Sequence, residues 1–436
     1  MSQLTEAKTR LKTALGSFRV KRLPSRKSET LQAWDAADEL LLDHLAVEHA
    51  LVLEEQVTNK ARLLIINDQF GALTTTLHRH SPDSWNDSSI SHLAAHLNLK
   101  ENVITNNGSG NDNDNDNDND NDNDNDNDKH NDNEASFNAI ASTDSLTGSY
   151  AIVLIKIPKT LSLLEQQLNS LRHHINSDTI VIAAGMTKSI HSSTLALFEK
   201  NLGETTTSRA TKKARLIFCK VDKEIISPTI TTSSELTTTR YFADPLETEL
   251  ISYANGFSRD RLDLGARAMM QAMSENSLPD AENIADLACG NGVLGLYALK
   301  VLSKDINKAD KQRCISFIDE SYMAVAAAKD NYQQVISDAD KHNIVPSFEV
   351  QDSIQKPDIN FDWIICNPPF HIGTAMDTYI ANRMFQQSFI ALQRTGQLWV
   401  VANRHLKYEN QIKKIFKNAK IVLSNKKFVV IAATKM

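Results

Sequence analysis

The sequence predicts an α/β fold of two tandem domains, each built on a doubly wound and mostly parallel sheet. Short apolar runs alternate with helical patterns in both halves of the chain, which is typical of strands joined by crossover helices. Four landmarks recur in the same order in the two halves, and a Thr- and Ser-rich segment at residues 222–239 separates them. We therefore predict one domain at residues 1–228 and a second at residues 229–436.

Seven apolar runs predict the strands of the second domain. They are Ile284–Leu287, Ile315–Ile318, Pro346–Val350, Trp363–Cys366, Leu398–Ala402, Ile421–Leu423 and Phe428–Ala432. Helical patterns separate the first five runs, which predicts parallel neighbours, because parallel strands need a crossover connection. A short turn joins the last two runs, so the last strand should be antiparallel. Ligands of such sheets bind at the carboxyl ends of the strands.

The first domain repeats the landmarks of the second. Arg62–Leu73 corresponds to Asn283–Leu294, Ala151–Lys159 to Asp362–Phe370, Thr179–Gly185 to Gln397–Asn403, and Lys212–Phe218 to Lys426–Val430. Any two open α/β sheets share some such features. Four landmarks in one order nevertheless favour a duplicated domain.

An uninterrupted run of nine Asn-Asp pairs occupies residues 111–128. The run has no apolar residue to bury and its charges repel one another. We therefore predict a disordered insertion at about residues 106–134, in preference to a calcium-binding loop. Without these nine carboxylates the formal net charge changes from −7 to +2, which permits an RNA partner but does not predict one.

Cysteine usage and hydropathy indicate the cellular compartment in which the protein acts. The four cysteines form no Cys-x-x-Cys pair and lie in or beside apolar runs, which favours reduced thiols in a cytosolic protein and no metal site. Residues 1–27 are polar and basic, and no apolar run reaches the roughly 18 residues that span a bilayer. We expect a cytoplasmic protein that has no membrane segment and acts as a monomer.

A glycine loop follows the first strand of the second domain and precedes a helix. It reads Asp286-Leu287-Ala288-Cys289-Gly290-Asn291-Gly292, and its glycines permit a tight turn and close approach of the backbone to a ligand. Gly295 completes the spacing of a dinucleotide-binding loop, so the loop by itself also fits a dinucleotide.

Acidic residues at three successive strand ends favour S-adenosylmethionine over a dinucleotide. Asp286 suits the cationic amino-acid end of this cofactor and would repel a pyrophosphate. Asp319 can accept hydrogen bonds from both ribose hydroxyls, and Asp352 lies where the adenine amino group would be. A single aspartate here is often a plain helix cap, but three in one sheet point to a ligand. The residues expected to bind the cofactor are Asp286, Ala288, Cys289, Gly290, Asn291, Gly292, Asp319, Glu320, Asp352 and Asn367.

The most specific motif is Asn367-Pro368-Pro369-Phe370, which follows the fourth strand. It suits methylation of a planar amino group, because the Asn367 side-chain oxygen and the Pro368 carbonyl can each accept one N–H. Holding both hydrogens makes the nitrogen pyramidal and aims its lone pair at the methyl group. The prolines keep the acceptors in place, and Phe370 offers a face on which a base can stack. A base in folded nucleic acid must be unstacked or single-stranded to enter such a site.

The motifs and their flanks resemble the ribosomal RNA guanine-N2 methyltransferases. The resemblance is carried by Asn367–His371, Val401–Leu406, Phe257–Arg259 with Leu262–Gly265, and Asn425–Val430. Leu31–Glu39 and Asn67–Leu73 resemble the large-subunit enzyme more than its small-subunit relative. Nearly the whole chain is covered. Ala288 departs mildly from the pattern, because a glycine is common there.

The resemblance implies two tandem Rossmann-like class I methyltransferase domains, each with a seven-stranded sheet. It implies that only the second domain binds S-adenosylmethionine and that the enzyme methylates N2 of one guanine in protein-free 23S rRNA. The first domain has lost both motifs, since Gln69 and Lys156 stand where Gly290 and Asn367 stand in the second. Phe257, Ser258, Arg259, His371, Arg404 and His405 are candidates for lining the site or positioning the base, although packing or surface roles fit them nearly as well.

The degenerate first domain is expected to position RNA. Its candidates for phosphate contacts are Lys156, Lys159, Arg172, Lys212, Lys213 and Arg215. Three alternative functions remain open. They are a 16S rRNA guanine-N2 methyltransferase, a protein-glutamine N5 methyltransferase, in which the last motif residue is usually Tyr, and a non-catalytic RNA-binding factor on the same fold.

Overall fold

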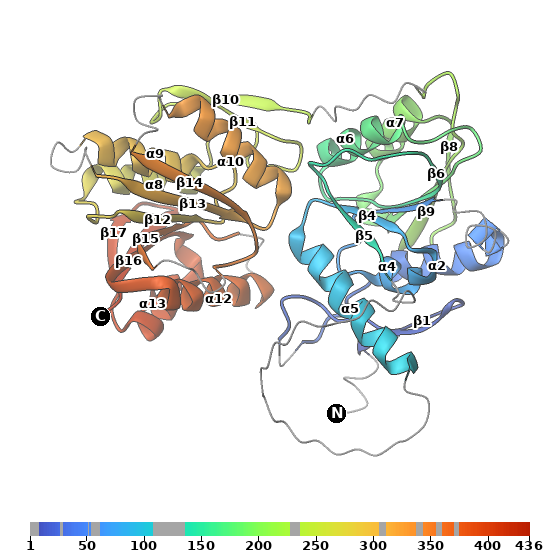
Figure 1. The fold of residues 1–436 in the computed structure, drawn as a ribbon, viewed down its shortest axis with the longest axis horizontal. Helices are drawn as coiled ribbons and strands as arrows, with labels where there is room; N and C mark the ends of the chain where they lie inside the picture. Colours follow the sequence, from blue (N-terminus) through green and yellow to red (C-terminus); the bar gives the residue numbers. More distant parts are fainter. Residues whose placement is uncertain are drawn as a thin grey trace, which may run out of the picture.

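The protein forms two lobes that lie side by side, with the N-terminal half of the chain in one and the C-terminal half in the other (Figure 1). The computed structural model describes residues 8–26, 29–50, 52–53, 62–107, 136–226, 236–304, 311–336, 343–354, 360–369 and 375–436. The predicted domain boundary at 228–229 lies outside these ranges. The same holds for residues 108–134 of the predicted Asn-Asp insertion.

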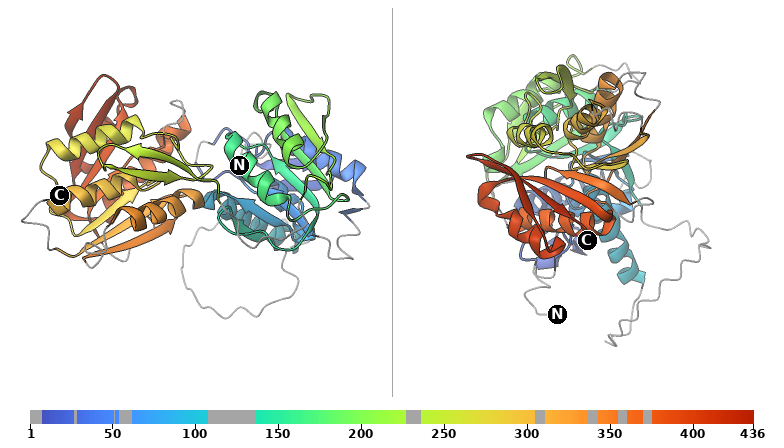
Figure 2. Two further views of the ribbon diagram at one scale, coloured as in Figure 1. Left: turned by 90° about the horizontal axis from the view of Figure 1, so that it is seen from above. Right: turned by 90° about the vertical axis from the view of Figure 1, so that its left-hand side faces the viewer.

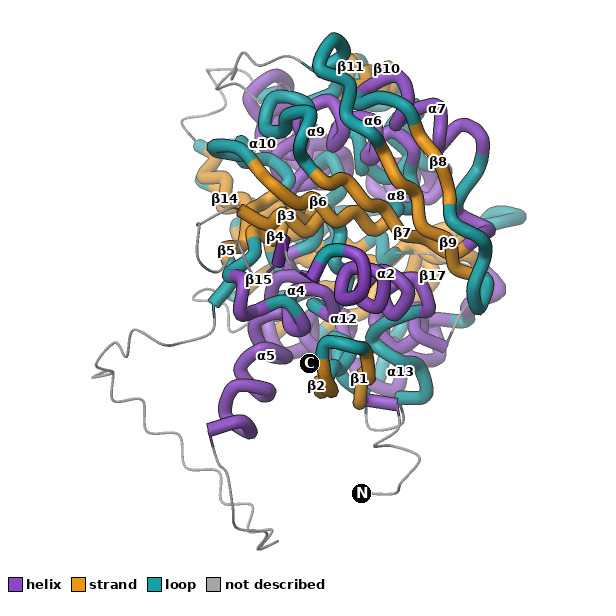
Figure 3. The backbone as a smooth tube through the Cα atoms, turned by 90° about the vertical axis from the view of Figure 1, so that its right-hand side faces the viewer, coloured by secondary structure: helices purple, strands orange, loops and turns teal. Residues whose placement is uncertain are grey.

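The N-terminal lobe contains a seven-stranded sheet in the order β5-β4-β3-β6-β7-β9-β8. Its strands are β3 (Arg62–Ile66), β4 (Asp83–Asn86), β5 (Asn138–Ala141), β6 (Tyr150–Lys156), β7 (Ile180–Met186), β8 (Thr205–Thr207) and β9 (Ala214–Cys219). Its helices are α2 (Ala36–Glu48), α4 (Ala72–Thr76), α5 (Ser89–Asn107), α6 (Leu161–Leu171) and α7 (Ser192–Asn201). Helices α2, α4 and α5 cover one face of the sheet, and α6 and α7 cover the other (Figure 3).

The C-terminal lobe contains a second seven-stranded sheet, in the order β14-β13-β12-β15-β16-β18-β17. Its strands are β12 (Asn283–Leu287), β13 (Arg313–Asp319), β14 (Ile344–Val350), β15 (Phe361–Cys366), β16 (Leu392–Asn403), β17 (Lys420–Ser424) and β18 (Phe428–Thr434). Its helices are α8 (Leu264–Glu275), α9 (Val293–Lys304), α10 (Tyr322–Val335), α12 (Ala375–Ala391) and α13 (Tyr408–Phe416). All seven predicted strands are present, and β18 is antiparallel to β16 and to β17, as predicted.

The two sheets have the same topology. In chain order, the strands of each sheet lie in the sequence third, second, first, fourth, fifth, seventh and sixth. The four repeated landmarks fall on matching strands, with β3 matching β12, β6 matching β15, β7 matching β16, and β9 matching β18. The predicted fold of two tandem α/β units with mostly parallel seven-stranded sheets is therefore confirmed.

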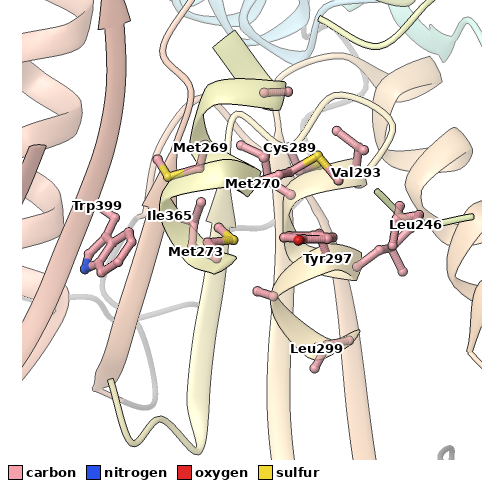
Figure 4. Packing of buried hydrophobic residues seen from close by; sticks show 14 of the residues in the cluster. Leu246, Met269, Met270, Met273, Cys289, Val293, Tyr297, Leu299, Ile365 and Trp399 are labelled. Carbon is pink, nitrogen blue, oxygen red and sulfur yellow. The ribbon is translucent and has the colours of Figure 1, made fainter. Parts of the chain in front are cut away.

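Packing against the sheet sets the position of the glycine loop. Met269, Met270 and Met273 of α8 lie beside Ile365 and Trp399 of the sheet in one buried cluster (Figure 4). Apolar side chains of the loop and of α9 complete this cluster, among them Cys289, Val293 and Tyr297. The strands are buried on both faces, which explains why their sequences read as continuous apolar runs.

Two β-hairpins were not predicted. One, β1 (Arg10–Thr13) with β2 (Gly16–Arg19), lies in the N-terminal lobe; the other is β10 (Thr239–Ala243) with β11 (Thr248–Ser252). The second begins at the last residue of the predicted linker, so Thr-rich sequence there forms a strand that packs in the C-terminal lobe. The end of this hairpin that is opposite its turn lies toward the N-terminal lobe when the protein is seen from above (Figure 2, left). Among the described residues, no helix has the length and apolarity needed to cross a membrane.

A buried carboxylate joins the two lobes. Asp87 follows β4 in the N-terminal lobe, is 5% exposed, and accepts hydrogen bonds from three groups of the other lobe. The donors are Met323 N at 2.9 Å, Ser321 Oγ at 2.7 Å and Asn255 Nδ2 at 2.6 Å. The amide of Ser89 also donates to the carbonyl of Glu320 at 2.9 Å. The N-terminal lobe therefore holds the segment that begins α10.

Candidate active site

A turn with left-handed backbone connects β12 to α9 and forms the glycine loop. Ala288, Gly290 and Gly292 have φ values of 59°, 53° and 80°. A Cβ on Gly290 would have no heavy atom within 4 Å, so this residue borders open space that a ligand can enter. A Cβ on Gly292 would lie 3.0 Å from Ala328 Cβ, so this glycine allows the loop to pack against α10.

Two carboxyl groups flank the loop. Asp286 Oδ2 accepts the Gly295 amide at 2.7 Å, whereas its Oδ1 is buried and has no hydrogen-bond partner among the described residues. Burial and the neighbouring charge of Asp319 raise the pKa of Asp286 to about 8. Asp319 accepts the amides of Gly290 and Ser321, both at 3.0 Å, and burial raises its pKa as well. A cation beside these groups would stabilise their ionised forms.

The side chains of Cys289 and Asn291 attach the glycine loop to the rest of the lobe. Cys289 is buried, and burial raises the pKa of its thiol well above the usual range, so the thiol is not an activated nucleophile. The Asn291 amide donates to Tyr241 OH at 3.1 Å and to Ser252 Oγ at 3.1 Å. Its side chain is therefore directed to β10 and β11. The predicted contact of Asn291 with the cofactor stays a prediction.

Glu320 and Asp352 also have partners within the protein. Glu320 accepts a hydrogen bond from Ser88 Oγ of the N-terminal lobe, and burial raises its pKa to about 7. Asp352 pairs with the guanidinium of Arg383 in α12, which also reaches Ser353 Oγ at 3.3 Å. An adenine amino group at Asp352 would therefore share that carboxylate with Arg383.

Asn367 lies next to the glycine loop at the carboxyl edge of the sheet. The last residues of β12 and β15, Leu287 and Cys366, are paired in register, so Ala288 and Asn367 leave the sheet side by side. The Asn367 Nδ2 donates to Asp263 Oδ2 at 3.3 Å. Its Oδ1 is buried and has no partner among the described residues. Pro368 and Pro369 follow, whereas Phe370 and His371 lie outside the described residues.

The N-terminal lobe retains the turn but not the site. Asn67 and Gly71, at the positions of Ala288 and Gly292, have φ values of 63° and 77°. The Asn67 amide exchanges hydrogen bonds with the amide of Gln167 at 2.7 and 2.9 Å, and these side chains occupy the end of the strand. Lys156, at the position of Asn367, forms ion pairs of 2.8 Å with Asp35 and 2.7 Å with Asp38. These contacts leave no amide acceptor for an amino group.

The ion pairs of Lys156 correct one of the predicted phosphate contacts. The Lys156 side chain is 14% exposed and neutralised by two carboxylates, so it does not face RNA. Lys212 is exposed and its ammonium forms a surface ion pair with Glu39 at 2.7 Å, so its contact with phosphate stays a prediction. Lys159 and Lys213 are exposed and form no ion pair among the described residues, and Arg172 and Arg215 are partly buried.

Exposed basic residues also gather beside Asn367. Arg404 follows β16, and its guanidinium donates to the Asn425 carbonyl at 2.9 Å, which places it next to Lys426 and Lys427. Phe428 comes next as the first residue of β18, and a Cβ on Gly265 would lie 3.4 Å from the Phe428 ring and 3.5 Å from Asn367 Oδ1. The turn that carries Lys426 and Lys427 and the loop that begins at Asn367 therefore both lie near the N-terminus of α8.

Sequence reasoning did not assign a role to Asp263 or Arg383. Asp263 could have been found as an N-cap, since it precedes the apolar pattern of α8 and its side chain accepts the Ala266 amide. Arg383 lies within a helix that has no distinctive motif, and no local signal indicates its partner.

Comparisons with known proteins identify relatives of both halves of the chain. Residues 247–432 match the methyltransferase small domain, and residues 8–113 and 116–223 match the RLMG N-terminal domain. The chain is 40% identical to the ribosomal RNA large subunit methyltransferase G of Aeromonas hydrophila and to that of Aeromonas salmonicida. Each alignment covers 98% of this chain and 99% of the relative. The fold is similar to that of the 16S rRNA N2 G1207 methyltransferase of T. Thermophilus, with a TM-score of 0.64, 16% identity and 98% coverage of both chains.

Proposed function

Because the chain belongs to the ribosomal RNA large subunit methyltransferase G family, we propose that it methylates the N2 amino group of one guanine in 23S rRNA. The observation that carries the proposal is the buried, unpartnered Asn367 Oδ1 beside the glycine loop. A buried amide oxygen without a partner costs free energy, which a substrate N–H would offset. An amino group of guanine supplies such a donor.

The described residues fit S-adenosylmethionine as the methyl donor. Asp286 Oδ1 lacks a partner, and Gly290 borders open space. We propose that Asp286 faces the cationic amino-acid end and that Asp319 accepts the ribose hydroxyls, while Ala288, Cys289 and Gly290 contribute backbone. Asp352, steadied by Arg383, would meet the adenine. When bound, the cofactor supplies an electrophilic methyl group on a sulfonium.

The protein's own part in the reaction is to hold the amino group. Asn367 Oδ1 and the Pro368 carbonyl each accept one N–H of the guanine amino group, which turns its lone pair toward the methyl group. Pro368 and Pro369 restrict the backbone that carries both acceptors. No general base is needed before transfer, because the nitrogen loses its proton afterwards. We propose that Phe370 stacks on the base.

The N-terminal lobe serves in this proposal to position RNA. Two hydrogen-bonded side-chain amides and an ion-paired lysine occupy the positions that form the site in the other lobe, so we assign the N-terminal lobe no cofactor and no chemistry. Its candidates for phosphate contacts remain Lys159, Arg172, Lys212, Lys213 and Arg215, and Arg404, Lys426 and Lys427 join them from the other lobe. We propose that a monomer acts in the cytoplasm on 23S rRNA before ribosomal proteins cover the guanine.

The test is methyl transfer from labelled S-adenosylmethionine to separate acceptors. These are protein-free 23S rRNA, protein-free 16S rRNA, assembled large subunits and a total protein extract. We expect label in protein-free 23S rRNA alone, recovered as N2-methylguanosine after nuclease digestion and mass spectrometry. Label in 16S rRNA would favour the small-subunit activity, and label in protein alone would favour a protein-glutamine methyltransferase; either result would refute the proposal.

A further inference from the structure

One carboxylate oxygen both caps a helix and holds the Asn367 amide. Asp263 is the N-cap of α8, and its Oδ2 accepts the Ala266 amide at 2.9 Å. The same oxygen accepts Asn367 Nδ2 at 3.3 Å. The two residues are 104 positions apart in the chain, so this contact exists only because α8 and β15 pack together.

The chemistry of this contact decides which way the Asn367 amide faces. An amide has one end that donates and one that accepts, and the two have nearly the same shape. A carboxylate only accepts, so it must meet the NH2 end. The oxygen end is then turned away from Asp263, and it is this atom that is buried without a partner.

We propose that Asp263 is a positioning residue, which keeps Asn367 Oδ1 oriented to accept the N–H of the substrate amino group. The proposal rests on the proposed function. If the amide rotated by half a turn, its NH2 would face the N–H donors of the substrate, and the amino group could not be held. Asp263 thus prevents the unproductive orientation without touching the substrate.

The internal repeat supports this assignment independently. In the N-terminal lobe, Asp35 is the N-cap of α2, and Lys156 is the last residue of the matching strand β6. Asp35 accepts the Ala37 amide at 2.9 Å and pairs with Lys156 at 2.8 Å. The fold therefore places an N-cap carboxylate against the carboxyl end of the fourth strand in both lobes. In the C-terminal lobe this carboxylate faces an amide, and its effect is on orientation.

The residue at position 265 must be small for the contact to form. A Cβ on Gly265 would lie 2.8 Å from Asp263 Oδ2 and 3.5 Å from Asn367 Oδ1. The first distance is shorter than real Cβ contacts allow, so a side chain would displace the carboxylate. Gly265 therefore leaves room for Asp263 to reach Asn367.

Three variants separate helix capping from amide orientation. Asp263→Ser keeps an N-cap, because a serine hydroxyl caps as well as a carboxylate, but its shorter side chain does not reach Asn367. Asp263→Asn keeps an acceptor oxygen for both bonds. Asp263→Ala removes both. Each is assayed for kcat, for the KM of the acceptor, for the Kd of S-adenosylmethionine and for Tm, with whichever acceptor the wild type methylates.

We expect Asp263→Ser to lower kcat by about 10- to 100-fold, with the cofactor Kd unchanged, while Asp263→Asn stays within about threefold of wild type. The two variants should have similar Tm values. Near wild-type kcat in Asp263→Ser would overturn the proposal. Equal losses in the Ser and Asn variants that follow Tm or cofactor affinity would also overturn it, since they indicate a structural role. Because the readout is a ratio between variants, failure of the 23S rRNA assignment alone would leave it interpretable.

Discussion

The Asp87 carboxylate offers the sharpest test of how the two lobes depend on each other. Asp87→Ala removes the acceptor of four hydrogen bonds, three from Met323 N, Ser321 Oγ and Asn255 Nδ2 of the other lobe and one from Ser142 Oγ of its own lobe. Each bond to a charged acceptor contributes about 1.5–3 kcal/mol, but the four share one carboxylate and do not add. The donors become unsatisfied in a region where Asp87 is only 5% exposed. We expect the free energy of unfolding to fall by about 3–5 kcal/mol.

Urea unfolding followed by tryptophan fluorescence, with calorimetry as a second probe, measures this loss. Asp178→Ala is the matched control, because Asp178 is exposed in the same lobe and its side chain forms no ion pair among the described residues. The control should stay within about 0.5 kcal/mol of wild type. Since α10 begins just after Asp319, S-adenosylmethionine should also bind more weakly to Asp87→Ala. A loss below about 1 kcal/mol would refute the reasoning, because so small a change is typical of an exposed site.

Four further predictions concern the site and the insertion. Asn367→Ala should lower kcat by at least about 100-fold while the Kd of S-adenosylmethionine, measured by calorimetry, stays unchanged. Methyl transfer at a near wild-type rate would contradict the proposal that Asn367 holds the substrate amino group. Because the pKa of Asp286 is raised to about 8, binding of the cationic cofactor at pH 7 should release a proton, and the affinity should increase as pH rises toward 8. Calorimetry in buffers of different ionisation enthalpy measures this release, and binding heats that do not vary with the buffer would contradict it. Ala288→Gly should stabilise the protein by about 1 kcal/mol in thermal unfolding, because Ala288 has a φ of 59°; no gain would mean that the turn is unstrained. Deletion of residues 111–128 should leave Tm and activity nearly unchanged, and loss of activity would show that the tract is not a passive insertion.

Local pattern was enough to locate the seven strands of the C-terminal sheet and the two motifs. Apolar runs such as Trp363–Cys366 and Ile315–Ile318 are read directly, because strands buried on both faces need continuous apolar sequence. The repeated landmarks also predicted the duplication, since each falls on the matching strand of its sheet. The hairpin of β10 and β11 was missed because its Thr-rich start has the composition of a linker, and only the fold shows that Tyr241 and Leu250 are buried in one cluster with side chains of α8, α9 and α10.

By itself, then, the sequence determined the α/β class, the tandem repeat, the glycine loop and the Asn367 motif, all of which depend on residues close together in the chain. Only the tertiary structure decided which distant side chains meet. It pairs Asp263 with Asn367, Asp352 with Arg383 and Lys156 with Asp35, and it sets Asp87 against the start of α10. The physical reason is that a hydrogen bond or ion pair between distant elements depends on how helices and strands dock, and apolar periodicity specifies which face is buried but not which polar groups come into contact.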